Sequence, residues 1–246
     1  MLALASYSTN NYFHFLTDSL AQLHWRDRVP ASRKAKLIIS GYSQEAEALL
    51  PFMGAATKAV GVALSELQPT DGTLLFCRKA IFPRRDTGMS PWKAQCLRKL
   101  FGVEGRPRGK KRLYVARGAA PRRRVLNEAA VEKLLAGHGF VSVNPGALSV
   151  TEQVELFASA EMVAGPHGAG LTNAVFMAPG GAIIEMTHDQ RVVWTFHEVA
   201  GAAGHAYVCV VNDAVMNKKD DDALFADFSV DLEALDAGVK AAIARL

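Results

Sequence analysis

The sequence is poor in cysteine, and its cysteines follow no metal-binding or redox pattern. The 246 residues include three, at Cys77, Cys96 and Cys209. Their wide separation matches no zinc or C-x-x-C spacing, and an odd, unpatterned set is typical of a reducing compartment. We therefore expect buried free thiols.

The sequence also lacks a segment that would direct it into or across a membrane. Its start, MLALASYSTNN, has no basic n-region and too short an apolar run for a signal peptide. The nearly uncharged stretch 162–184 is interrupted by glycine and proline into pieces too short to span a bilayer. We expect a soluble, cytoplasmic protein, for which peripheral contact with a membrane surface stays open.

Several signatures of other enzyme classes are missing as well. No G-x-G-x-x-G fingerprint follows the first strand of either half, which argues against a dinucleotide site. No G-x-S-x-G elbow occurs, which excludes a lipase-type nucleophile. No Asp-x-Asp motif stands at a strand end, and Asp220 to Asp222 lie in a polar loop. Metal and other cofactors are therefore not expected to be required.

What the sequence does contain is an uneven charge. The formal net charge is +4, and many of the basic residues fall in one middle section. They are Arg84, Arg85, Arg106, Arg108, Lys110, Lys111, Arg112, Arg117, Arg122, Arg123 and Arg124. Such a cluster suits an anionic ligand. Nucleic acid is not expected, because aromatic residues are not interleaved with the basic ones and no nucleic-acid-binding motif occurs.

Apolar periodicity outlines an α/β protein. It predicts helices at 10–25, 44–53, 91–101, 127–136, 151–159, from 168, at 192–202 and at 231–246. It predicts strands at 36–40, 59–63, 113–116, 140–143, 162–165, around 183 and at 207–211, with an extended segment at 73–82. Residues 102–111 have the composition of a linker or exposed loop. The regular alternation after them predicts a parallel sheet with helices on both faces.

Ligands of such sheets bind beyond the carboxyl ends of the strands, where Arg117, Asn144, His167 and Glu185 or Thr187 would meet. The run PHGAGLTN, 166–173, follows an apolar strand and opens a short helix. Unpaired N–H groups and the helix dipole favour a phosphate there, and Gly168 and Gly170 would let it approach the main chain. The His167 side chain is expected to donate to a phosphate oxygen, although a tight connection with a satisfied histidine is the plain alternative.

Two further segments carry candidate residues. Arg117 and the run Arg122 to Arg124 could hold phosphate oxygens through forked, charge-assisted hydrogen bonds, with a solvated face as the alternative. In NYFHFLTDSL, His14 and Asp18 stand four residues apart, hence on one helical face. Either could take a proton from an attacking hydroxyl. An ordinary helix pair with a surface aspartate is the alternative.

These segments together resemble the family 61 glycosyltransferases. The resemblance is carried by NYFHFLTDSL, YVARGAAPRRRVLNE, LSVTEQVELFASAEMVAGPHGAGLTNAVFMAPGGAIIEM and a late GHAY, in the same order and with similar spacing. It implies a GT-B architecture, in which two Rossmann-like domains face each other across a cleft. Family members usually carry more sequence before the first motif. Either the N-terminal domain is abbreviated, or the sequence begins downstream of its natural start.

The resemblance implies an N-terminal acceptor-side domain over 1–104, a nucleotide-sugar domain over 105–228 and a C-terminal helix over 229–246 that packs back on the first domain. It implies an inverting transfer from a nucleotide sugar, often a uridine diphosphate sugar, to a glycan or glycolipid hydroxyl. Catalytic candidates are His14 and Asp18. Donor-binding candidates are Arg117, Arg122, Arg124, Glu152, Gln153, His167, Gly168, Ala169, Gly170, Asn173 and Glu185. A non-catalytic module that binds nucleotides or polyanions is the competing interpretation. Oligomeric state leaves no signal in the sequence.

Overall fold

The computed structural model describes residues 2–5, 11–30, 35–40, 61, 67–69, 76, 78–81, 88–117, 122–215 and 223–246. Its larger part is a five-stranded parallel sheet in the order β5-β4-β6-β7-β8. The strands are β4 (Lys111–Val115), β5 (Phe140–Val143), β6 (Ala160–Pro166), β7 (Ala182–His188) and β8 (Ala206–Asn212). This arrangement is Rossmann-like and confirms the predicted α/β class.

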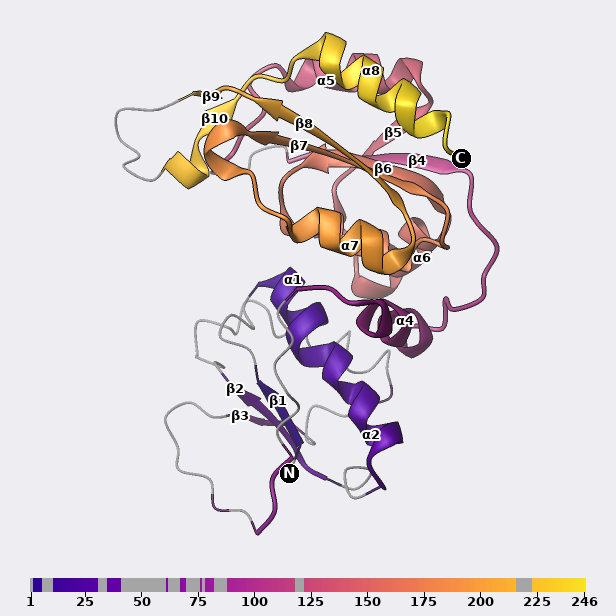
Figure 1. Ribbon diagram of the computed structural model, residues 1–246, viewed down its shortest axis with the longest axis vertical. Helices are drawn as coiled ribbons and strands as arrows, with labels where there is room; N and C mark the ends of the chain where they lie inside the picture. The colour runs from indigo at the N-terminus through magenta and orange to yellow at the C-terminus, as the bar shows by residue number, and fades with distance from the viewer. Residues whose placement is uncertain are drawn as a thin grey trace.

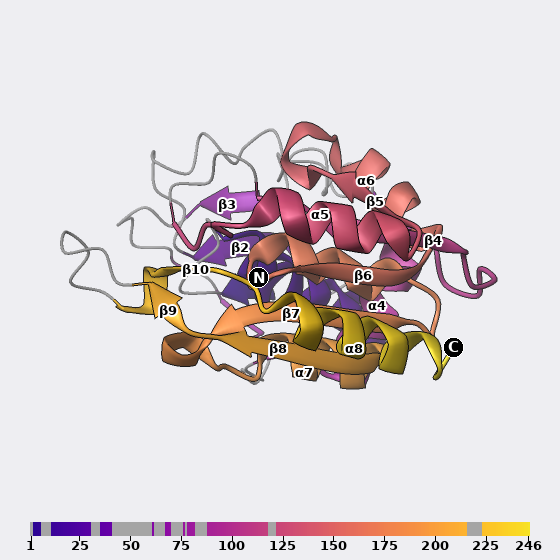
Figure 2. The ribbon, with the colours of Figure 1, turned by 90° about the horizontal axis from the view of Figure 1, so that it is seen from above.

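Helices cover both faces of this sheet, as the alternation predicts. Helices α5 (Glu128–Gly137) and α8 (Leu232–Ile243) lie side by side on one face, and α6 (Val150–Ala158) and α7 (Thr195–Ala203) lie on the other (Figures 1 and 2). Short 3-10 segments follow β5, β6 and β7, namely η6 (Pro145–Ala147), η7 (Ala169–Phe176) and η8 (Asp189–Arg191). The sequence predicts each of the four α-helices within a few residues of its observed ends.

The sheet is held by two hydrophobic cores, because successive strand residues point to opposite faces. In β6, Val163 packs into the core beneath α6 and α7, whereas its neighbours Met162 and Ala164 pack beneath α5 and α8. All seven residues of β7 are buried. Two buried faces explain why β6 and β7 read as continuous apolar runs rather than as alternating ones.

Helix α8 corrects one expectation. It contacts β7, β8 and α5, and its buried residues Leu235, Val239 and Ala242 belong to the core beneath α5. Within the described residues, the C-terminal helix therefore packs on its own sheet rather than on the N-terminal part. A small antiparallel pair, β9 (Ala214–Val215) with β10 (Asp227–Phe228), and the 3-10 turn η9 (Ala223–Phe225) lie between β8 and α8.

The N-terminal part contains a second parallel sheet, in the order β1-β2-β3. Its strands are β1 (Leu2–Ala5), β2 (Leu37–Ser40) and β3 (Leu67–Pro69). The sequence predicts β2 and misses β1 and β3. The helix expected at 44–53 and most of the segment at 73–82 lie outside the described residues, as does the strand at 59–63 except for Gly61, which is in a turn.

The predicted helix at 10–25 is present with an irregular winding. It runs through α1 (Tyr12–His14), a π-helical turn η1 (Phe15–Ser19), a 3-10 turn η2 (Leu20–Leu23) and α2 (His24–Arg28). A π-helical turn within an α-helix is rare and is frequently found at functional sites. Both Asp18 and its neighbour Thr17 lie in it.

The N-terminal and C-terminal parts share one hydrophobic core. Helix α4 (Pro91–Leu100) contacts η2 on one side and α7 and η7 on the other, and α1 contacts η7. Phe13 and Leu16 belong to the same buried cluster as Phe176 and Phe196. Figure 1 shows α1 and α4 directly below α7 and α6, the helices on the lower side of the larger sheet. In the part of the chain that the structure describes, no helix is long and apolar enough to cross a membrane.

Candidate functional site

The carboxyl ends of β4, β5 and β6 open onto a pocket of about 190 Å³. Its lining residues include Arg117 after β4, Asn144 after β5, and Gly168 and Gly170 after β6. These four residues come from three separate motifs of the sequence. The structure therefore brings Arg117 and the glycine corner together at the sheet edge, as the alternation of strands and helices predicts.

The Arg117 guanidinium lies against the main chain of this corner. Its Nη1 donates to the His167 carbonyl at 3.4 Å, and its Nη2 donates to the Arg122 carbonyl at 3.1 Å. Its Nε is buried and has no hydrogen-bond partner. The pKa of Arg117 is lowered, mainly by burial. The negative charge of Glu128 opposes this shift, and the positive charge of Arg191 adds to it. A guanidinium with a spare donor at this edge is suited to an anionic ligand.

Arg123, which belongs to the arginine run singled out in the sequence, and Arg191, which sequence reasoning missed, extend this positive charge. Burial, together with the charges of Arg117, Arg191 and Arg122, lowers the pKa of Arg123 to about 10. The Arg123 backbone has φ 54, a left-handed conformation that is uncommon outside glycine. Guanidinium groups of Arg123 and Arg191 lie 5.8 Å and 5.9 Å from the Phe225 ring centroid. Arg117, Arg191 and Arg122 all act on Arg123 as like charges. Such repulsion is costly, and an anion would relieve it.

His188 adds a further polar group at this edge. It ends β7, is fully buried, and neither ring nitrogen has a hydrogen-bond partner. Burial lowers its pKa, as do the charges of Arg191 and Arg123, against the opposing effect of Asp189. We refer to Arg117, Arg123 and Arg191 as the cationic edge, beside which His188 is a buried, uncharged polar group.

The three adjacent arginines take three different roles. Arg122 is exposed and its guanidinium stacks on Phe225, 4.3 Å from the ring centroid. Arg123 belongs to the cationic edge. Arg124 instead forms a forked ion pair with Asp227 of β10, with N···O distances of 2.9 and 2.6 Å. Its guanidinium thus joins the β4–α5 loop to β10, and the contact of Arg124 with the donor stays a prediction.

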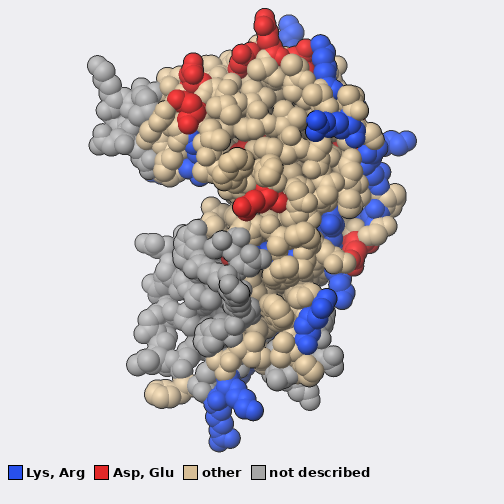
Figure 3. Space-filling view, in the orientation of Figure 1, with Lys and Arg blue, Asp and Glu red and all other residues tan. Residues whose placement is uncertain are grey.

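Two further arginines of the basic middle section are also engaged within the protein. Exposed Arg106 pairs with Glu155, and Arg108 donates to the carbonyls of Gly180 and Leu246. Lys and Arg side chains gather on one side of the molecule in Figure 3. Arg106 and Arg108 therefore hold residues 102–110 onto the C-terminal part, whereas Arg117 and Arg123 belong to the cationic edge.

His167 and Glu185 lie behind the corner rather than in the pocket. The Glu185 carboxylate accepts from Tyr207 through one oxygen and forms a short hydrogen bond with His167 Nδ1 through the other. Glu185 is 1 % exposed and His167 is 6 % exposed. Sequence reasoning placed Glu185 at the strand end, but β7 continues to His188. Both side chains bond to other protein groups in this structure, and their contacts with a donor stay a prediction.

Three other donor-binding candidates have structural partners. Ser149 and Glu152 form a reciprocal capping box at the start of α6, with the Glu152 side chain accepting from the Ser149 N–H at 2.8 Å. Asn173 is fully buried and donates to Gln153 at 2.9 Å. The capping spacing was visible in the sequence, whereas the Asn173–Gln153 contact depends on tertiary packing. Ala169 begins η7 at the corner, as expected.

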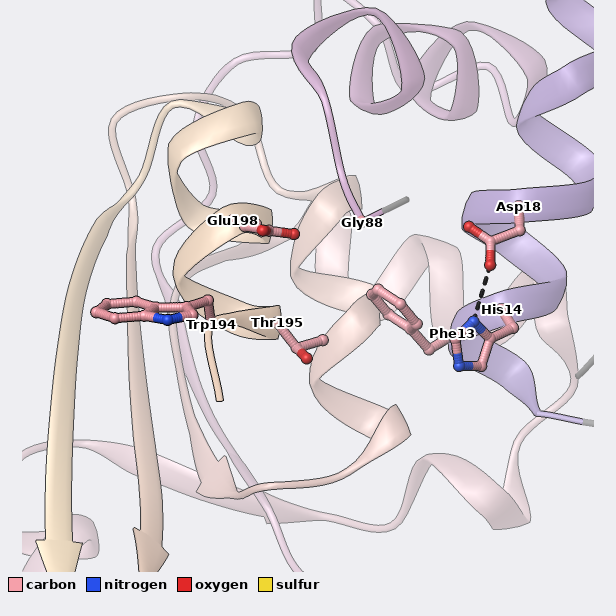
Figure 4. A pocket seen from close by; sticks show the side chains of 7 residues that line it. All are labelled: Phe13, His14, Asp18, Gly88, Trp194, Thr195 and Glu198. Carbon is pink, nitrogen blue, oxygen red and sulfur yellow. Dashed lines mark hydrogen bonds and ion pairs between the residues drawn. The ribbon is translucent and has the colours of Figure 1, made fainter. Parts of the chain in front are cut away.

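A second cavity, of about 260 Å³, lies between the N-terminal and C-terminal parts. Figure 4 shows His14 and Asp18 on one side of it and Thr195 and Glu198 of α7 on the other. His14 Nδ1 lies 2.8 Å from Asp18 Oδ2, and Thr17 donates to Asp18 Oδ1 at 3.0 Å. Fully buried Lys93 stands 3.9 Å from the same carboxylate. The pair is therefore not a surface contact, because Asp18 is 7 % exposed.

This geometry has the parts of a base held by a carboxylate. Asp18 holds the His14 ring through Nδ1 and so fixes the orientation of Nε2. Glu198, which sequence reasoning did not single out, provides a carboxylate across the cavity. Among the described residues, no group of three or more His, Cys, Asp or Glu side chains could hold a metal ion.

The larger sheet thus carries arginines at its carboxyl edge, where ligands of such sheets bind, and a separate cavity holds a histidine–aspartate pair able to exchange a proton. The family model of Glycosyltransferase 61 matches residues 12–184, well over half of the chain. The protein belongs to this family of glycosyltransferases. The matched range includes α1 with His14, the Arg117 strand and the glycine corner. No curated protein matches the chain.

Proposed function

We propose that this glycosyltransferase moves a sugar from a nucleoside diphosphate donor, a uridine diphosphate sugar in the first instance, with inversion at the anomeric carbon. The two parallel sheets would act as the halves of a GT-B enzyme. Residues 1–104 would serve the acceptor and 105–228 the donor. The residues after 228 would complete the donor side.

The observation that carries the proposal is the meeting of Arg117 with the Gly168 corner at the carboxyl edge of the sheet. The Nε group of Arg117 is buried without a partner, and the corner offers main-chain N–H groups at the start of η7. A diphosphate bound there would accept hydrogen bonds from both and neutralise the cationic edge. Arg122 would contribute from the exposed side.

The acceptor would enter the cavity between the two parts. Its hydroxyl would give its proton to His14 Nε2 as the oxygen attacks the anomeric carbon, while the bond from that carbon to the phosphate oxygen breaks. Asp18 would stabilise the resulting imidazolium. The leaving diphosphate would be stabilised by Arg117, Arg123 and the dipole of η7. A single displacement of this kind inverts the anomeric configuration.

Because guanidinium groups supply positive charge to the leaving group, we expect turnover without an added metal. We propose a glycan or glycolipid acceptor, which would place the enzyme in polysaccharide or cell-envelope synthesis on the cytoplasmic side. The compartment, like the acceptor, is a proposal from the family resemblance.

A panel of sugar nucleotides tests this function. Release of nucleoside diphosphate should occur with at least one sugar nucleotide and should persist in a chelator. It should be lost in both His14→Ala and Arg117→Ala. Turnover that vanishes with a chelator and returns with manganese would contradict the metal-independent mechanism. The competing non-catalytic binder predicts no turnover, with preference for heparin or DNA and steep salt dependence.

A further inference from the structure

Tyr12 ties the N-terminal helix to the C-terminal part through a chain of buried hydrogen bonds. Its phenolic O–H donates to Asn173 Oδ1 in a short hydrogen bond. Asn173 Nδ2 donates to Gln153 Oε1 at 2.9 Å, and Gln153 Nε2 donates to the Leu148 carbonyl at 3.1 Å. The chain therefore runs from the start of α6 through η7 to α1.

The helix that carries Asn173 is the one that begins at the glycine corner. Helix η7 covers Ala169–Phe176, with Gly168 as the residue before it. Its N-terminal end is the proposed diphosphate site, and Asn173 is one turn and more further along. A displacement of η7 would therefore move both the glycine corner and the Asn173 side chain that binds Tyr12.

His14 stands two residues after Tyr12 in the same short helix. The intervening Phe13 packs edge-on against Phe196 of α7, with ring centroids 6.3 Å apart, and against the His14 ring at 5.2 Å. Residues 12 and 13 are therefore both anchored on the C-terminal part, and His14 projects from this anchored turn into the cavity.

Loss of the hydrogen bond from Tyr12 would lower the stability of the fold. Burial raises the pKa of the Tyr12 phenol, an effect that outweighs the bond to Asn173, so the hydroxyl remains a neutral donor over the working pH range. Asn173 is fully buried, and Gln153 is 7 % exposed. Removing one partner would leave buried amide groups unsatisfied.

We propose that Tyr12 is a positioning residue for His14. Its bond to Asn173 sets the place of the His14 ring relative to the donor corner, so that one helix, η7, aligns the base with the leaving group. The inference rests on the proposed role of His14 as the base. Geometry errors of about 1 Å at a reacting group can cost roughly a hundredfold in rate, which gives such an anchor its value.

The test is Tyr12→Phe, which removes a single hydroxyl group. The melting temperature rise caused by UDP should be kept, because the corner is untouched. The ring resonances of His14, identified by their loss in His14→Ala, should move in NMR spectra. Amide hydrogen exchange in α1 should quicken roughly tenfold, as expected for the loss of one buried hydrogen bond.

The matched control is Tyr114→Phe. Tyr114 is also a buried tyrosine, and its hydroxyl donates to Glu128 Oε1 at 3.1 Å within the C-terminal part. This variant should lose stability without moving the His14 resonances or the exchange of α1. Gln153→Met, which breaks the far end of the chain, should act on α1 in the same direction as Tyr12→Phe.

Unchanged His14 resonances and unchanged α1 exchange in Tyr12→Phe would overturn the positioning role. An equal response in Tyr114→Phe would overturn it too, because the effect would then be general loosening. If Tyr12→Phe behaves as expected but His14→Ala keeps full turnover, the link stands and the assignment of the base fails. The two failures are therefore distinguishable.

Discussion

Arg117 and Gly168 fit against each other with no room for a side chain at position 168. A methyl group added to Gly168 would lie 2.5 Å from Arg117 Nη1. The Gly168 backbone has φ 179, which is an extended conformation open to any residue. Glycine is therefore needed at 168 for space and not for backbone freedom, and the space is filled by the guanidinium.

Gly168→Ala should displace the Arg117 side chain and leave the fold intact, because the end of a long side chain can move aside. We expect UDP affinity to fall about tenfold, the loss of roughly one charge-assisted hydrogen bond, as measured by isothermal titration. Gly137→Ala is the control, since nothing lies within 4 Å of a methyl group there. Equal affinity for UDP in Gly168→Ala and the wild type would show that the glycine corner is not part of the donor site.

Arg123 and Arg124 should respond in opposite ways to replacement by alanine. Arg123→Ala relieves repulsion in the cationic edge, so stability without ligand should stay level or rise by up to about 1 kcal/mol, while the UDP-dependent rise in melting temperature should be lost. Arg124→Ala breaks the half-exposed ion pair with Asp227 and should lower the free energy of unfolding by about 1 kcal/mol. The rise in melting temperature caused by UDP should be retained. Thermal unfolding with and without UDP measures both. The reverse pattern would mean that the ion pair, not the cationic edge, meets the donor.

Asp18→Asn should lower the turnover number by roughly a hundredfold or more, because the amide cannot stabilise a protonated His14. UDP affinity should be unchanged. The control is Asp236→Asn, which breaks another histidine–aspartate contact, His138 Nε2 to Asp236 Oδ1 at 2.7 Å, on the far face of the sheet. That variant should turn over at the wild-type rate. A wild-type rate in Asp18→Asn would remove the pair from the mechanism.

His205 should make the fold sensitive to acid. Burial lowers its pKa to about 4, opposed by the bond to the Ala174 carbonyl and assisted by the charge of Arg98. As pH falls below about 6.5, the unfolded chain takes a proton that the folded protein does not, so stability decreases until about pH 4. We expect a loss of roughly 2 kcal/mol between pH 7 and pH 5 from this residue.

Urea unfolding at the two pH values measures this loss. His205→Gln, which keeps an N–H donor for Ala174, should show a smaller difference between them. His197→Gln, at an exposed position, should keep the wild-type difference. If His205→Gln lost as much stability between pH 7 and pH 5 as the wild type, other groups would be responsible for the acid sensitivity.

The larger sheet and the pocket at its carboxyl edge could be predicted from sequence because both follow from local sequence patterns. Short apolar strands that alternate with amphipathic helices leave few arrangements, and Arg117 and Gly168 each come directly after a strand. Ser149 and Glu152 also carry a readable capping signature.

The directions of individual side chains could not be predicted. Arg122, Arg123 and Arg124 are identical in chemistry, and nothing in their sequence tells which of them pairs with Asp227, lies over Phe225 or joins the cationic edge. Glu185 reads as a strand-end acid because polar Thr187 and His188 follow it, yet both remain within the buried strand. Asn173 reads as part of the glycine corner, while its partners lie 20 and 161 positions away along the chain.

The most direct test of the donor site is isothermal titration of UDP into the wild-type protein and into Arg117→Ala, with circular dichroism to show that both are folded. The account predicts that the wild type binds UDP and that Arg117→Ala, equally folded, binds it at least tenfold more weakly. Equal affinity for UDP in the two proteins would contradict it.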